Sequence, residues 1–169
     1  QYSAEAPALD LEAELPRAYA QKLSNGSPPD SRVGDIDKGL AAAAVQIKAT
    51  YTTPVEHHNP LEMHATTAVW QGAEQLTLYD STQGVFEVQR KAATLFGLPR
   101  ENVRVIAHFV GGGFGCKGSV WSHVILAAMA AKHVGRPVKL VVTRQQMFDL
   151  VGHRPRTRQE VTLGATRDG

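Results

Sequence analysis

Cysteine is almost absent from this sequence: Cys116 is the single one in 169 residues. One cysteine excludes an internal disulfide framework, and it excludes a multi-cysteine zinc or iron–sulfur site built by this chain alone. Long apolar runs are absent too, since none approaches the roughly 18 residues that a membrane span needs, and no signal peptide opens the chain. We therefore expect no membrane span and a location in the cytoplasm or the periplasm.

The sequence also lacks a strong excess of charge of one sign. Lysine and arginine number 18 against 16 aspartates and glutamates, which leaves a net charge of +2. That balance gives no reason to expect a nucleic-acid partner. The apolar share of 43% and the charged share of 20% are those of a globular chain, and the length suits about one domain by the prior of roughly 150 residues per domain.

The C-terminal end predicts a continuation of the chain. Residues 159–163 (QEVTL) are typical of a strand, and the turn dipeptide Asp168-Gly169 follows. A strand and a turn predict a second strand that this sequence does not contain. We therefore expect part of a longer polypeptide, truncated at its C-terminal side, with residues 1–42 as a lead-in or linker and residues 43–169 as a partial domain.

Apolar periodicity predicts the elements of an α+β fold with mixed sheets and packed helices. Strands are predicted at Val45–Tyr51, His64–Trp70, Leu76–Tyr79, Val103–Val110 and Val138–Thr143. One helix is expected from a cap at Ser81 or Thr82 to Gly97, and another from a cap at Ser119 to Val134. The second helix is apolar almost all round, which predicts an interior position.

Between a strand and a helix lies the glycine-rich segment 111–118 (GGGFGCKG), an arrangement that favours anion binding. It satisfies the dinucleotide pattern G-x-G-x-x-G. However, no acidic residue for the ribose occurs between Glu101 and Asp149. Lys117 is followed by Gly118 rather than Ser or Thr, so the segment is not a P-loop. The acid-free window contains six basic residues, which predict locally positive surroundings: Arg104, Lys117, Lys132, Arg136, Lys139 and Arg144.

Three interpretations of this segment remain open from the residues alone. A nucleotide- or phosphate-binding module without a redox metal is one, and a tight structural turn is another. Cys116 beside Lys117 could be a nucleophile, although a small buried residue is the commoner role of a lone cysteine.

The histidine-rich segment 57–64 lacks H-E-x-x-H spacing, and Pro60 prevents a helix, so a lining loop is favoured over a zinc site.

Four segments in order resemble the molybdopterin-binding large subunit of the xanthine dehydrogenase and aldehyde oxidase family. They are residues 58–66 (HNPLEMHAT), 80–84 (DSTQG), 109–118 (FVGGGFGCKG) and 135–140 (GRPVKL). The resemblance runs from about residue 43 to the end. It implies a molybdenum hydroxylase that oxidises aldehydes or N-heterocycles with water as the oxygen source, where electrons leave through iron–sulfur clusters and a flavin. A [2Fe–2S] cluster takes four cysteines, so FAD and [2Fe–2S] are expected on partner subunits.

The resemblance also implies roles for individual residues. The cofactor-binding set is Gly112, Gly113, Phe114, Gly115, Gln83, Glu56 and His57. Of these, Phe114 is implied to lie with its backbone beside the metal. Glu56 and His57 stand where the family often has a Gly-Gln pair whose glutamine contacts the metal's apical oxygen. The family's catalytic glutamate lies far C-terminal of this region, so no catalytic residue is assigned and we expect the 169-residue chain alone to be inactive.

The substrate class depends on Gly118. Members that oxidise hydroxypurines carry a glutamate at this place, so the glycine is assigned to substrate binding and favours an aldehyde over a purine. In a bacterial host, the resemblance implies the cytosine dinucleotide form of molybdopterin.

Overall fold

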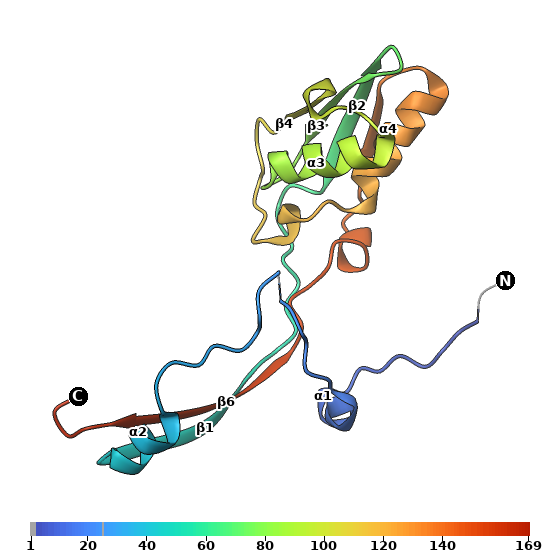
Figure 1. Cartoon of the computed structure of the whole chain (residues 1–169). Coiled ribbons are helices and arrows are strands. Elements are labelled where there is room, and N and C mark those ends of the chain that lie inside the picture. Colours follow the sequence, from blue (N-terminus) through green and yellow to red (C-terminus); the bar gives the residue numbers. More distant parts are fainter. Residues whose placement is uncertain (1–2, 25) are drawn as a thin grey trace. The chain divides into compact units, whose positions relative to one another are not determined.

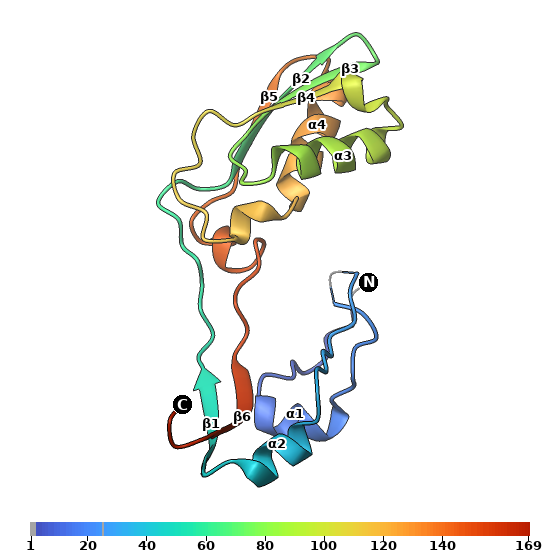
Figure 2. The same ribbon diagram turned by 60° about the vertical axis from the view of Figure 1, so that its left-hand side comes forward.

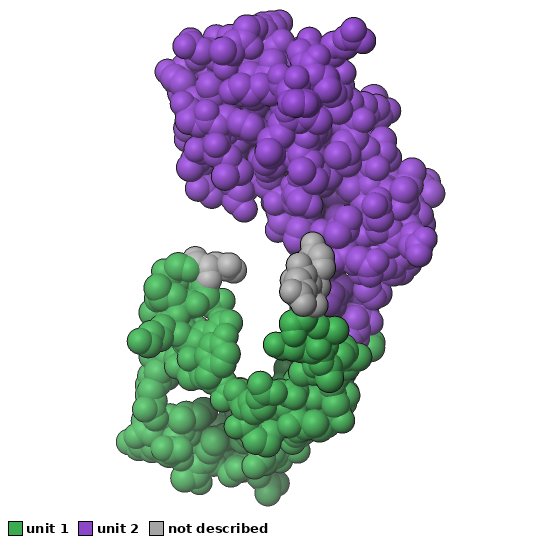
Figure 3. All heavy atoms as spheres, turned by 90° about the vertical axis from the view of Figure 1, so that its right-hand side faces the viewer, with its two compact units in different colours: residues 1–54, 156–169 green, residues 55–155 purple. Residues whose placement is uncertain are grey.

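The computed structural model describes residues 3–24 and 26–169. Asn25 lies outside the described residues, within a segment whose composition is typical of a loop, residues 24–30 (SNGSPPD). The chain divides into two compact units, residues 1–54 with 156–169 and residues 55–155 (Figure 3). The predicted boundary after residue 42 falls inside the first unit. As a domain boundary of a longer protein it stays a prediction.

The first unit holds two short helices and a two-stranded ribbon. The helices are α1 (Leu11–Glu14) and α2 (Ile36–Ala42), each preceded by an aspartate that caps it: Asp10 accepts from the amide of Glu12, and Asp35 from that of Lys38. The strands β1 (Val45–Thr53) and β6 (Thr157–Ala165) pair antiparallel along their whole length (Figure 2).

The ribbon also shows a pairing that was not predicted. One edge of β6 pairs with β1, with Val45 opposite Ala165 and Thr53 opposite Thr157. A further strand after Asp168-Gly169 stays a prediction. One face of the ribbon carries the apolar residues, and Ile47 and Leu163, which face each other, are 58% and 62% exposed. This apolar face is therefore left uncovered by the described residues.

The second unit is a four-stranded mixed sheet in the order β4-β3-β2-β5. Strands β2 (Ala65–Gln71) and β3 (Gln75–Asp80) form an antiparallel hairpin, β5 (Val138–Val141) pairs antiparallel with β2, and β4 (Val103–Ile106) pairs parallel with β3. Helices α3 (Val85–Phe96) and α4 (Ser122–Val134) lie on the same side of the sheet (Figures 1 and 2). The α+β class with mixed sheets and packed helices is confirmed.

The core of the second unit lies between the helices and one face of the sheet. Alternation along the strands turns one set of side chains toward the helices, which bury them almost completely. The buried cluster is Ala68, Leu76, Leu78, Val88, Ala92, Ala93, Val103, Val124, Ala127, Ala128 and Ala131. At its edge, the indole nitrogen of Trp70 donates to the carbonyl of Ala128 at 2.8 Å, which fixes α4 on β2.

Helix starts differ from the sequence prediction. α3 begins after Gly84 without a side-chain cap, because the hydroxyl of Thr82 donates to the carbonyl of Lys117 and accepts from the Gly84 amide. α4 begins at Ser122 rather than directly after Ser119, since a 3-10 turn occupies residues 116–118. Gly97 ends α3 in the left-handed conformation, as predicted.

Two further expectations about these elements were wrong. α4 is not interior all round, because Leu126 and Met129 are 51% and 53% exposed. β4 ends at Ile106 rather than at Val110. The carbonyl of Val110 instead accepts a hydrogen bond from a buried lysine described below. Among the described residues, no helix is both long and apolar enough to cross a bilayer.

Candidate functional site

The glycine-rich loop between β4 and α4 turns sharply because four residues have positive φ. They are Gly111 (φ 55°), Gly112 (φ 88°), Phe114 (φ 54°) and Gly115 (φ 100°). Phe114 is the unusual member, since a bulky side chain is rarely found in the left-handed region and strain of this kind gathers at functional sites. Its side chain is exposed. The turn therefore exposes the Phe114 side chain to solvent, and three glycines beside it adopt the other positive φ angles of the turn.

The glycines of the loop differ in what they leave room for. A Cβ on Gly113 would lie 2.3 Å from Oε1 of Gln83, so any other residue here would displace the Gln83 side chain. Around Gly115 and Gly118 a Cβ would meet nothing within 4 Å. Open space therefore adjoins the loop at these two positions, and Gly115 needs glycine for its φ alone.

Gln83 holds the loop from the end of β3. Its side-chain Oε1 accepts a hydrogen bond from the backbone amide of Gly115 at 3.0 Å, and its backbone amide donates one to the carbonyl of Lys117 at 2.9 Å. The structure thus brings Gln83 to the glycine loop. Its contact with a cofactor stays a prediction.

A pocket of about 320 Å³ adjoins the turn, lined by Glu56, His57, His58, Phe114 and Arg154. The backbones of Glu56 and Arg154 form two hydrogen bonds with each other, at 3.0 and 2.9 Å, which hold these two lining residues side by side. The guanidinium of Arg154 donates to the carbonyl of Phe114 at 3.1 Å. Three predicted site residues, Glu56, His57 and Phe114, therefore share one pocket, and Gly118 does not line it.

One buried polar side-chain atom among the residues that line this pocket lacks a partner in the part of the chain that the structure describes. Nδ1 of His58 is buried and has no hydrogen-bond partner among the described residues. Burial, followed by the charge of Arg154, lowers the pKa of His58, so its ring is neutral at pH 7 and can donate or accept. An unpaired buried nitrogen costs about 1–3 kcal/mol, which a bound polar group would relieve.

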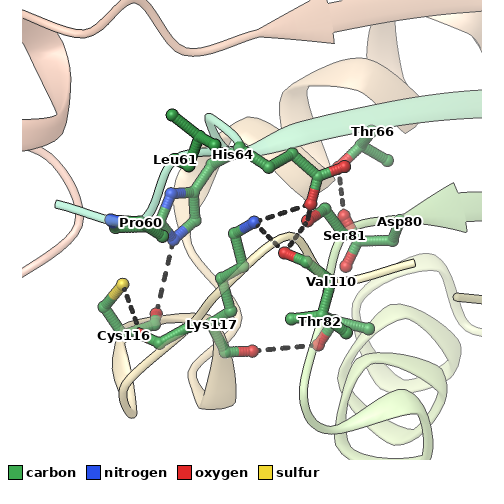
Figure 4. Close-up of polar contacts among 12 residues, drawn as sticks. Pro60, Leu61, His64, Thr66, Asp80, Ser81, Thr82, Val110, Cys116 and Lys117 are labelled. Carbon is green, nitrogen blue, oxygen red and sulfur yellow. Dashed lines mark hydrogen bonds and ion pairs between the residues drawn. The ribbon is translucent and has the colours of Figure 1, made fainter. Parts of the chain in front are cut away.

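Beside the loop lies a buried lysine, one of the six basic residues predicted to make the surroundings of the loop positive (Figure 4). Lys117 is 1% exposed, and its ammonium donates to Oε2 of Glu62 at 2.8 Å and to the carbonyl of Val110 at 2.5 Å. Burial raises the pKa of Glu62, but hydrogen bonds from Lys117 and Ser81 outweigh it and lower the pKa overall. The positive charge of Lys117 is therefore balanced by the carboxylate of Glu62 inside the protein, and it adds no positive charge to the surface of the loop.

Other members of the basic set are also engaged. Arg144 donates to the carbonyls of Pro60 and Leu61, each at 2.8 Å, and Lys132 lies 4.6 Å above the ring of Trp70. The prediction of a positive surface around the loop is therefore wrong for Lys117. Arg154, outside the acid-free window, supplies the guanidinium at the pocket instead.

Beneath the loop, His64, Asp80 and His123 form a buried polar cluster. The rings of His64 and His123 meet edge to face at 5.6 Å, and Nε2 of His123 lies 4.0 Å from the Asp80 carboxylate. Burial, then the nearby charges of His64 and Lys117, lowers the pKa of His123 to about 4. Burial raises the pKa of Asp80 from 3.8 to about 6, against a 2.5 Å hydrogen bond from Thr66. At neutral pH His123 is uncharged, so its contact with Asp80 is not an ion pair.

Cys116 does not have the surroundings of a nucleophile. Its thiol is buried and donates to the carbonyl of Gly113 at 3.0 Å, and burial raises its pKa. Both features oppose formation of the reactive thiolate. Within residues 3–24 and 26–169, no group of three or more His, Cys, Asp or Glu side chains is placed to hold a metal ion.

Sequence reasoning did not assign Arg154, Glu62 or Ser81 to the site. Glu62 and Ser81 lie in two of the segments that carry the resemblance, and that placement is a signal that could have found them. Arg154 has no such signal, because its contact with Phe114 spans 40 residues.

Several known proteins are similar to this chain. A family model described as a molybdopterin cofactor-binding domain matches residues 17–169. The molybdenum-binding subunit PaoC of an aldehyde oxidoreductase from Escherichia coli K12 is 44% identical over 141 residues, 83% of this chain and 19% of that protein. A probable hypoxanthine oxidase, XdhD, from the same strain is 36% identical over 137 residues, 81% of this chain and 14% of that protein.

A solved structure shares the fold. The reconstituted CO dehydrogenase from Oligotropha carboxidovorans matches with a TM-score of 0.69 and 30% identity, over 79% of this chain and 17% of that one. The chain therefore spans less than a fifth of the length of each of these relatives. The matches support the molybdopterin interpretation of the chain and not the nucleotide-binding alternative.

Proposed function

The chain belongs to the family of molybdopterin cofactor-binding domains, in the aldehyde oxidase and xanthine dehydrogenase group, and on this premise we propose that it forms one wall of a molybdenum cofactor site. The observation that carries the proposal is the pocket where Phe114 meets His58 and Arg154. In the longer protein, the remaining walls come from segments beyond this chain.

The pocket residues fit such a group. A molybdopterin carries a phosphate and a ring system rich in nitrogen and oxygen, so it needs hydrogen-bond donors and acceptors at close range. Arg154 offers a charged guanidinium and His58 an unpaired Nδ1, and the loop offers open space beside Gly115. These groups, with the backbone of residues 112–115, would hold the cofactor.

When bound, the molybdenum cofactor supplies the oxidation of a carbon centre with water as the oxygen source. The residues of this chain bind and orient. Gln83 accepts a hydrogen bond from the Gly115 backbone amide, and Arg154 donates one to the carbonyl of Phe114, so the single peptide group between Phe114 and Gly115 is held at both its N–H and its C=O. Preorganised dipoles of this kind act without reorganising during the reaction.

We place the substrate among aldehydes rather than purines. A hydroxypurine presents several polar ring atoms, and leaving one unpaired in a buried site costs about 1–3 kcal/mol. Gly118 offers no carboxylate to pair with them, and PaoC, at 44% identity, is by name an aldehyde oxidoreductase subunit. N-heterocycles are the second candidate class, favoured by the likeness to XdhD.

The proposal extends to the cofactor form and the partners. We propose the cytosine dinucleotide form of molybdopterin, with FAD and [2Fe–2S] clusters on partner subunits that carry electrons away. The clusters are placed on partner subunits because Cys116 is the single cysteine of this chain, and a cluster takes four. The cytosine dinucleotide form is what the family resemblance implies for a bacterial protein.

The test uses the longer protein purified with its partner subunits. We expect molybdenum and a molybdopterin nucleotide in near-equal amounts with the subunit, and a kcat/KM for benzaldehyde above that for xanthine. A Gly118→Glu variant, which has room for a side chain, should raise the xanthine value relative to the aldehyde value. Protein without molybdopterin contradicts the proposed site, and a xanthine value at or above the aldehyde value contradicts the substrate class.

A further inference from the structure

The two ends of the glycine loop are tied together by a single side chain. Lys117, near the C-terminal end, reaches back so that its ammonium donates to the carbonyl of Val110 at the N-terminal end (Figure 4). The Lys117 side chain is fully buried. Both the aliphatic carbons and the ammonium group of Lys117 are therefore shielded from solvent.

Glu62 completes this closure from outside the loop. Its carboxylate accepts from the Lys117 ammonium at 2.8 Å and from the Ser81 hydroxyl at 2.5 Å, while its amide donates to the carbonyl of Gly111 at 3.0 Å. A Cβ on Gly111 would lie 2.2 Å from the Cβ of Glu62, so the two backbones are in close contact. Glu62 thus fixes the first glycine and the lysine at once.

The carbonyl of Lys117 is held as well. It accepts hydrogen bonds from the hydroxyl of Thr82 at 3.1 Å and from the backbone amide of Gln83 at 2.9 Å. Oε1 of Gln83 then accepts from the amide of Gly115. Both ends and the middle of the loop are therefore anchored to residues 62 and 81–83, and residues 112–114 lie between the anchors.

Burying an ammonium is costly, and a methionine of similar size would fill the same space without that cost. Unlike methionine, the ammonium donates a directional hydrogen bond to the carbonyl of Val110. This bond fixes the distance between Val110 and residue 117. Phe114 needs that constraint, since its left-handed backbone is unfavourable for a bulky residue and persists only when its surroundings impose it.

We propose that the Glu62–Lys117 ion pair is a positioning device that holds the glycine loop, and with it the Phe114 peptide, in the conformation that accepts the cofactor. The inference rests on the proposed function for the identity of the ligand. The loop-holding part is a property of this chain and can be tested without the ligand.

The experiment measures amide hydrogen exchange and molybdopterin content of the longer protein with its partner subunits. The variants are Lys117→Met and the milder Glu62→Gln, whose side chain is 39% exposed and so tolerates the change. Glu87→Gln is the matched control, because it removes the exposed pair between Glu87 and Arg90 on α3. Exchange is measured both on protein made without molybdopterin and on loaded protein.

We expect peptides covering residues 110–118 to exchange about tenfold faster in both variants, the change that follows from roughly 1.4 kcal/mol of lost local stability. Peptides from β2 and α4 should keep their wild-type rates, the molybdopterin content should fall, and the control should match wild type. The double variant should loosen the loop no more than Lys117→Met alone, because both changes break one interaction.

Three results would overturn the proposal. They are unchanged loop exchange in both variants, equal loosening of the loop and α4, and a loosened loop with a wild-type molybdopterin content. Failure of the proposed function is distinguishable, since it leaves wild-type protein without molybdopterin. In that case, loop exchange in the ligand-free variants still decides whether the ion pair holds the loop.

Discussion

At the scale of single residues, positive φ decides which glycines of the second unit can be replaced. Gly115 in the loop (φ 100°) and Gly72 in the β2–β3 turn (φ 65°) both have nothing within 4 Å of a built Cβ. Alanine at either position should therefore cost about 1–2 kcal/mol of backbone strain and create no clash.

This matched pair separates stability from cofactor binding. We expect Gly115→Ala and Gly72→Ala to lower the free energy of unfolding by similar amounts in urea titrations. In the longer protein, molybdenum content should fall for Gly115→Ala alone, because its methyl group enters the space beside the loop. Equal molybdenum content in the two variants would place the cofactor elsewhere.

The buried pair Asp80 and His123 predicts two opposite pH dependences. The folded pKa of Asp80 is raised to about 6, so its contribution to stability is present below about 3.8 and is lost as the pH rises through about 6. The folded pKa of His123 is lowered to about 4, so its contribution is present above 6.5 and is lost as the pH falls through about 4. Between pH 4 and 6 the two effects partly cancel.

Single substitutions should remove that cancellation. From pH 6 to pH 4, Asp80→Asn should lose stability relative to wild type and His123→Gln should gain it, by at most about 1.4 kcal/mol per pH unit. Urea unfolding at several pH values measures both. His133→Gln, an exposed histidine on the same helix, is the control. Curves parallel to wild type in both variants would contradict the assigned pKa directions.

At the scale of elements, the side of the helices that packs on the sheet contributes more to stability than their outer side. Leu78 on β3 is fully buried between sheet and helices, whereas Leu126 on α4 is 51% exposed. Leu78→Ala should cost about 2–5 kcal/mol in the unfolding free energy of the 169-residue chain, because it leaves a cavity. Leu126→Ala should stay within about 0.5 kcal/mol. Similar losses for both would show that α4 is covered on its outer face.

Local signals predicted the elements of the second unit well. Alternation identified β2, β3 and β5, and Gly97 marked the end of α3, because each depends on residues adjacent in sequence. The caps failed because Thr82 bonds to Lys117, which lies 35 residues away. A hydroxyl with two possible partners looks the same in sequence whichever one it takes.

The contact between Lys117 and Glu62 was missed for the same physical reason. The glycines, Gln83 and Phe114 were predicted as site residues because they lie in short segments that resemble the family. The burial of Lys117 depends on Glu62, 55 residues earlier in the chain. Composition counts a lysine as a surface cation, since a buried ammonium is rare without a partner and the partner is not a sequence neighbour. Pairing of β1 with β6 was missed likewise, because each strand pattern is complete without the other.

At the scale of the whole molecule, the second unit carries its own core. Residues 55–155 contain the mixed sheet, both long helices and the buried cluster, and a pair of hydrogen bonds between Glu56 and Arg154 joins their two ends. We therefore expect residues 55–155 expressed alone to fold, with helical circular dichroism and a single cooperative thermal transition. Residues 1–54 alone should show no such transition, because β1 then lacks its partner. A non-cooperative melt of residues 55–155 would contradict this.

The pairing of β1 with β6 has a consequence for the growing chain. Thr53 and its partner Thr157 are 104 residues apart, an interval that takes roughly 5–20 s to synthesise at ordinary elongation rates. During that interval the second unit can fold, while β1 stays unpaired with Val45, Ile47 and Tyr51 available to other strands. Nascent chains caught in this interval are therefore the species most exposed to aggregation, and the ones for which a chaperone matters most.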